Sequence, residues 1–182
     1  MNYGQIYYSD VANGIGCRTA FFVSGCTHHC KGCFNEMTWD FNYGQEYTKE
    51  VENEIVESPK PSYIDGLTIL GGEPMELVNQ KEIKPLLERI KKEVPRATIW
   101  IYSGYTWEEL TDPANKRCHG DDTDAILSMT DVLVDGEFEL DKRDLMLRFR
   151  GSSNQRVIDV KASLETGEVV LSKYNDRDTS RL

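Results

Sequence analysis

The chain has 182 residues, of which 21 are basic and 31 acidic, so its net charge is −10. That length corresponds to about one domain, large enough for a single hydrophobic core. A surface this acidic repels phosphate backbones and anionic lipid, which excludes nucleic acid and membrane surfaces as partners. No apolar run reaches the ~18 residues of a membrane helix, and residues 1–10 lack the layout of a signal peptide. We therefore expect a cytoplasmic protein.

Continuous apolar runs are the main signal for strands in this chain. Such runs are typical of strands buried on both faces, as in parallel sheets. They predict strands at residues 18–24, 67–70, 98–102 and 132–134.

Helical patterns separate these strands. Thr48 is a candidate cap for a helix that ends near Glu57, and residues 83–94 carry apolar side chains at helical spacing. Residues 106–109 have the Thr-x-x-Glu form of a capping box, and residues 122–129 form a further candidate helix. Strands that alternate with helices indicate an α/β fold.

The length limits which α/β architecture is possible. A complete barrel of eight strand–helix units needs at least ~200 residues. We therefore expect a partial, open (β/α) barrel of about five or six mostly parallel strands, formed by residues 1–156. Residues 157–160 and 169–171 are apolar and flank Glu-Thr-Gly-Glu, which predicts that residues 157–182 form a β-hairpin extension of the same domain.

Each predicted strand runs directly into a loop that contains glycine. In parallel α/β folds, ligands bind at the carboxyl ends of the strands. These loops would open on one face of the sheet, which predicts a site there. The glycines concerned are Gly25, Gly71, Gly72, Gly104 and Gly136.

Five cysteines form the most informative feature of the composition. They are Cys17, Cys26, Cys30, Cys33 and Cys118. An odd number, with three inside eight residues and no export signal, indicates metal or redox chemistry rather than disulfides. Thiolates suit iron in clusters, and a 4Fe-4S cluster with only three cysteine ligands leaves one iron open.

Two other interpretations of the cysteines remain open at this point. A structural zinc site would take its fourth ligand from Cys17, His28, His29, Cys118 or His119. An electron-transfer ferredoxin would need a fourth cysteine for each cluster, and the spacing Cys-x3-Cys-x2-Cys matches neither ferredoxin pattern. Outside the cluster loop, we expect Cys118 and His119 to lie in a surface loop.

The loop at residues 26–33 resembles the cluster-binding signature of the radical S-adenosylmethionine enzymes. Gly71-Gly72-Glu73-Pro74 resembles the second motif of that superfamily, which contacts the amino group of S-adenosylmethionine. A narrower resemblance spans roughly residues 1–156 and points to the activating proteins of anaerobic ribonucleoside-triphosphate reductases. It is carried by residues 13–18, 22–26, 33–35, 131–136 and 150–155.

The resemblance implies a 4Fe-4S cluster, one per chain, held by Cys26, Cys30 and Cys33. It implies reductive cleavage of S-adenosylmethionine to a 5′-deoxyadenosyl radical, which takes hydrogen from a glycine of the reductase large subunit. A reduced flavodoxin or ferredoxin would supply the electron, and no catalytic residue is expected beyond the cluster and its cofactor. The expected contacts of S-adenosylmethionine are Gly32, Cys33, Phe34, Gly71, Gly72, Glu73 and Ser103.

Competing functions are an activase of another glycyl-radical enzyme, or a radical enzyme acting on a small molecule, such as a deazaguanine-forming synthase. The wide mouth of a partial barrel favours a substrate presented as a protein loop. A non-catalytic zinc-binding interaction module is the alternative outside enzymes.

Overall fold

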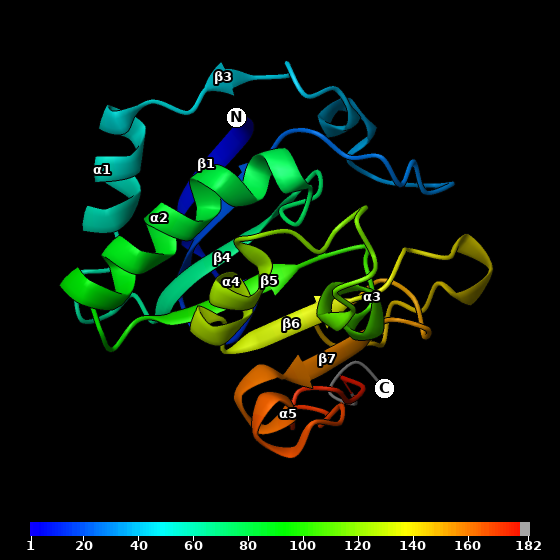
Figure 1. Cartoon of the computed structure of the whole chain (residues 1–182). Coiled ribbons are helices and arrows are strands. Elements are labelled where there is room, and N and C mark those ends of the chain that lie inside the picture. Colours follow the sequence, from blue (N-terminus) through cyan, green and yellow to red (C-terminus); the bar gives the residue numbers. More distant parts are fainter. Residues whose placement is uncertain (179–182) are drawn as a thin grey trace.

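Within residues 1–178, which the computed structural model describes, seven strands form one mixed sheet (Figure 1). The order of the strands is β3-β1-β2-β4-β5-β6-β7. Four central strands run parallel to one another: β2 (Arg18–Val23), β4 (Gly66–Gly71), β5 (Thr98–Tyr102) and β6 (Val132–Asp135). These are the four strands that the apolar runs predict, and the α/β class is confirmed.

The outer strands correct the prediction of five or six mostly parallel strands. β1 (Asn2–Asp10), β3 (Gln45–Glu46) and β7 (Arg156–Asp159) all pair antiparallel to their neighbours, and the sheet is not closed. The connection from β1 to β2 is only residues 11–17, and short connections join antiparallel strands. β1 is largely polar and, apart from buried Tyr3, partly or fully exposed, so no apolar run marks it in the sequence.

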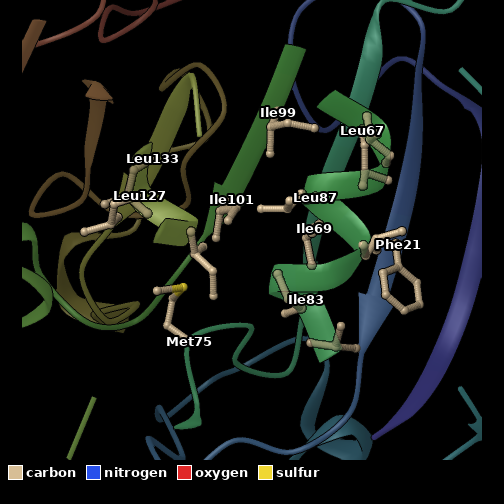
Figure 2. Packing of buried hydrophobic residues seen from close by; sticks show 14 of the residues in the cluster. Phe21, Leu67, Ile69, Met75, Ile83, Leu87, Ile99, Ile101, Leu127 and Leu133 are labelled. Atoms are coloured by element: carbon tan, nitrogen blue, oxygen red, sulfur yellow. The ribbon is translucent and has the colours of Figure 1, made fainter. Parts of the chain in front are cut away.

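One face of the sheet packs against helices. α1 (Lys49–Glu57), α2 (Leu77–Glu93) and α4 (Thr123–Met129) contribute apolar side chains to the same core as the central strands. Figure 2 shows Ile83 and Leu87 of α2 pointing toward Ile69 and Ile101 of the sheet. The core therefore fixes the central strands, and with them the loops at their carboxyl ends.

Two predicted helix caps are confirmed. Thr48 accepts a hydrogen bond from the backbone N–H of Val51 at the start of α1. Thr106 and Glu109 form the expected capping box of α3 (Trp107–Thr111). Two 3-10 helices, Glu36–Trp39 and Leu140–Lys142, are also present. No helix within the described residues 1–178 is both long and apolar enough to cross a membrane.

The prediction of a C-terminal hairpin is confirmed in its antiparallel pairing but wrong in its connection and its place. Residues 170–172 return beside β7, where the N–H of Ser172 donates to Val157 O at 2.8 Å and the N–H of Asp159 donates to Val170 O at 2.9 Å. β7 joins the main sheet beside β6, and α5 (Val160–Thr166) follows it directly. Asp159 caps this helix through the N–H of Ala162, and Gly167 ends it with a left-handed φ of 77°. The Glu-Thr-Gly-Glu segment is therefore a helix end rather than a turn between strands. The final residues of the predicted extension, 179–182, lie outside the described residues.

Candidate functional site

A cavity of about 590 Å³ lies at the carboxyl ends of the central strands. Its volume is within the range of sites that bind small molecules and cofactors. All nine residues predicted to hold the cluster or the cofactor line this cavity: Cys26, Cys30, Gly32, Cys33, Phe34, Gly71, Gly72, Glu73 and Ser103. The structure therefore brings together residues that are up to 77 positions apart in the chain.

The loop that follows β2 carries the three cysteines of the cavity, and all three are free thiols. Burial raises the pKa of Cys26 to about 12, and it also raises the pKa of Cys30. Buried thiols of this kind are neutral unless a nearby positive charge stabilises the thiolate. A bound cationic metal centre would supply that charge.

Backbone N–H groups interact with the sulfurs of this loop. Such donors stabilise a thiolate and tune a metal centre bound to it. The N–H of Asn35 donates to Cys33 Sγ at 3.4 Å. The backbone groups of His28 and His29 also lower the pKa of Cys26, and those of Phe138 and of Cys30 itself lower the pKa of Cys30, in both cases by less than burial raises it.

Within residues 1–178, no three His, Cys, Asp or Glu side chains are grouped closely enough to hold a single metal ion. The fit of the loop to an iron–sulfur cluster rests on other features. These are the three free thiols, the backbone N–H that donates to Cys33 Sγ, and the cavity beside them.

The loop after β4 lies directly against the cysteine loop. The N–H of Gly72 donates to Val23 O at 2.8 Å, and the N–H of Glu73 donates to Gly25 O at 2.7 Å. A Cβ atom on Gly72 would lie 2.6 Å from Gly25 O and 3.0 Å from Thr38 O. Only glycine permits this approach of the two backbones.

Gly72→Ala should therefore destabilise the protein by about 2 kcal/mol, because overpacking against backbone atoms forces the two loops apart. Chemical denaturation of the purified chain measures the change. Gly120→Ala is the matched control, since its Cβ would meet only the end of the Leu77 side chain. Equal unfolding midpoints for the two variants would contradict the close approach.

The carboxylate of Glu73 is fully buried and accepts four hydrogen bonds from within the chain. Its Oε1 accepts from the N–H of Met75 and from Ser103 Oγ, both at 2.8 Å. Its Oε2 accepts from the N–H of Gly104 at 2.7 Å and from His28 Nε2 at 2.8 Å. Glu73 therefore connects three of the loops that form the cavity.

His28, which the sequence suggested only as a candidate zinc ligand, contacts two carboxylates at the cavity. Besides Glu73, its ring contacts Glu137 through Nδ1 at 2.7 Å. Burial alone would lower the pKa of His28, but the hydrogen bonds and charges of Glu73 and Glu137 raise it. His29, its neighbour, is exposed and stacks on Trp39. The spacing of the motif contains no signal that separates the two histidines.

Residues 143–155 form one wall of the cavity. Of these residues, only 150–155 resemble a family motif. Phe149 anchors this wall by packing edge-on against Trp100 of β5 and against Tyr174 of the tail. The backbone N–H of Arg148 also donates to the tail, at Asp176 O. Residues after β7 therefore support the cavity from outside.

The two remaining cysteines lie away from the cavity. Cys17 precedes β2 and donates its backbone N–H to Asp65. The prediction of a surface loop for Cys118 and His119 is wrong, because both side chains are buried. Burial raises the pKa of the Cys118 thiol to about 11. Cys118 packs in the core beside α3, and His119 Nδ1 bonds Leu110 O.

Comparison with known proteins agrees with this site. The family model described as a 4Fe-4S single cluster domain matches residues 12–158, which supports an iron–sulfur cluster rather than zinc. The anaerobic ribonucleoside-triphosphate reductase-activating protein of Vibrio cholerae is 43% identical over 85% of this chain and 96% of its own length. The protein of the same name from Pasteurella multocida is 41% identical over 85% of this chain and 95% of its own. The protein of the same name from Escherichia coli K12 is 40% identical over 86% of this chain and 97% of its own length. The chain therefore belongs to the family of anaerobic ribonucleoside-triphosphate reductase-activating proteins.

Proposed function

We propose that this protein activates an anaerobic ribonucleoside-triphosphate reductase by reductive cleavage of S-adenosylmethionine. The 5′-deoxyadenosyl radical would abstract hydrogen from a glycine of the reductase large subunit and leave a glycyl radical there. One observation carries the proposal: the three-cysteine loop and the Gly-Gly-Glu-Pro loop line a single cavity. The names of the relatives supply the partner.

Cys26, Cys30 and Cys33 would hold the 4Fe-4S cluster, with the fourth iron left open for S-adenosylmethionine. When bound and reduced by a flavodoxin or ferredoxin, the cluster supplies the electron that splits the sulfonium bond. The three cysteines fix the site at the end of β2, and the amides around them stabilise their thiolates. The surrounding protein orients the reacting groups and excludes water.

The loop after β4 would bind the amino acid part of S-adenosylmethionine. Gly71 and Gly72 let the ligand approach the backbone, and Glu73 places a buried negative charge beside a cationic amine. Because its four internal hydrogen bonds hold Glu73 in place, this charge is already positioned before the ligand binds. Gly32, Phe34 and Ser103 also line the cavity, where the nucleoside would lie.

Exposed apolar side chains at the mouth of the cavity would contact the reductase. Leu145 lines the cavity and is 71% exposed. Leu145→Asp should reduce glycyl-radical formation about tenfold at limiting reductase, because an apolar contact worth more than 1.4 kcal/mol is lost. Cleavage of S-adenosylmethionine in the absence of reductase should fall much less than this, because most of the Leu145 side chain faces solvent.

Leu164→Asp is the matched control for that experiment, since Leu164 is also exposed but lies on α5, away from the cavity. Electron paramagnetic resonance of the reductase measures the glycyl radical in each case. If Leu145→Asp activates as well as Leu164→Asp does, the reductase does not dock at this rim.

Anaerobic reconstitution with iron and sulfide tests the cofactor and the reaction together. We expect a brown protein that binds S-adenosylmethionine and, after reduction, yields methionine and 5′-deoxyadenosine. A colourless protein that retains one zinc ion would exclude the proposed function.

A further inference from the structure

His28 lies where the loops of the cavity meet. It belongs to the cysteine loop, contacts Glu73 of the loop after β4, and contacts Glu137 of the loop after β6. We propose that His28 is a positioning residue, which sets the place of the cysteine loop from His28 to Cys33 relative to Glu73. This proposal rests on the function proposed above and adds a residue to it.

Both nitrogens of the His28 ring are engaged with carboxylates. Nε2 lies 2.8 Å from Glu73 Oε2, and Nδ1 lies 2.7 Å from Glu137 Oε1. Carboxylates accept hydrogen bonds, so the ring serves as the donor toward both sides. No ring nitrogen is left to bind a metal, so the role of His28 differs from that proposed for the cysteines on either side of it.

The loop after β5 is shaped around the same ring. A Cβ atom on Gly104 would lie 2.6 Å from Cδ2 of His28, so only glycine leaves room for the imidazole. The ring of Tyr105 packs edge-on against it, with 4.3 Å between the centroids. The His28 side chain is only 3% exposed, so it cannot turn away from these contacts.

The bond from His28 to Glu73 has a function that the other bonds of Glu73 do not share. Met75, Ser103 and Gly104 hold the carboxylate within the loops after β4 and β5. His28 alone joins it to the cysteine loop by a direct side-chain bond. Loss of His28 would leave Glu73 partnered and would leave the backbone bonds of Gly72 and Glu73 to the start of the cysteine loop intact. The part of the cysteine loop from His28 to Cys33 would lose its direct bond to Glu73 and would be free to shift relative to it. A displacement of this kind weakens cofactor binding and reaction geometry.

The cysteine loop has a second attachment that should preserve the fold when His28 is changed. Thr27 bonds Glu76 through both its N–H at 2.8 Å and its Oγ1 at 2.6 Å. A substitution at His28 should therefore leave the three cysteines able to bind iron. Retained iron binding would distinguish a positioning role of His28 from a general structural one.

The test compares His28→Ala, His28→Gln and the control His29→Ala in the full chain after anaerobic reconstitution. We expect all three to retain the iron content of the unchanged protein. His28→Ala should bind S-adenosylmethionine at least tenfold more weakly. His28→Gln, which keeps one donor, should fall between His28→Ala and the unchanged protein, and His29→Ala should bind normally. Normal binding by His28→Ala, or loss of iron from it, would overturn the proposal.

Hydrogen exchange supplies a readout that needs no cofactor. The Gly104 amide, which shares Glu73 Oε2 with His28, should exchange faster in His28→Ala than in His29→Ala. Unchanged exchange would also overturn the proposal. If the unchanged protein itself fails to bind S-adenosylmethionine, the proposed function fails. If it binds but His28→Ala binds equally well, only the role of His28 fails.

Discussion

Cys30→Ala should lose the iron–sulfur cluster and with it all detectable cleavage of S-adenosylmethionine. Cys30 lies between the other two cysteines in the loop, and two thiolates would not suffice to hold the proposed cluster, which would already lack a fourth protein ligand. Iron and sulfide content after reconstitution, together with the yield of 5′-deoxyadenosine, measures both losses.

Cys118→Ala is the control for this experiment, because Cys118 is buried in the core and does not line the cavity. It should keep the cluster and the activity and lose about 1 kcal/mol of stability from the small void created. Cleavage by Cys30→Ala at the rate of the unchanged protein would refute the ligand assignment.

Glu73→Ala should have the largest effect on stability among the substitutions considered. It removes the shared acceptor of four buried donors, and each unpaired buried donor costs about 1–3 kcal/mol. Some of these donors will find water in the space left, so we expect a loss of about 4 kcal/mol in the free energy of unfolding. Binding of S-adenosylmethionine should be lost as well.

Chemical denaturation measures this loss, with Glu82→Ala as the matched control. Glu82 is exposed on α2, and exposed substitutions of this kind change stability by less than about 0.5 kcal/mol. If Glu73→Ala unfolded at the same midpoint as Glu82→Ala, the network around Glu73 would not be formed in solution.

The central strands and the composition of the site were predictable from the sequence. β2, β4, β5 and β6 are continuous apolar runs, and each ends in a glycine-containing loop. Parallel strands place their carboxyl ends along one edge of the sheet, so these loops had to meet. That local rule explains why residues as distant as Cys26 and Ser103 line one cavity.

Other features depend on contacts that no local pattern encodes. β1 pairs with β2 although no apolar run marks it as a strand in the sequence. The segment after β7 forms a helix because Asp159 caps it and Gly167 ends it, although the apolar residues around it suggested strands. His28 and His29 are adjacent residues of the same type, so the sequence does not distinguish them. In the folded chain, only His28 contacts Glu73 and Glu137.

The formation of a glycyl radical on the reductase tests the proposed function most directly. The reconstituted protein is incubated anaerobically with the reductase, S-adenosylmethionine and a reductant, and the sample is examined by electron paramagnetic resonance. We predict a glycine-centred doublet on the reductase, which is absent when Cys30→Ala replaces the unchanged protein. If the unchanged protein cleaves S-adenosylmethionine but produces no doublet, activation of this reductase is contradicted, and another substrate must receive the radical.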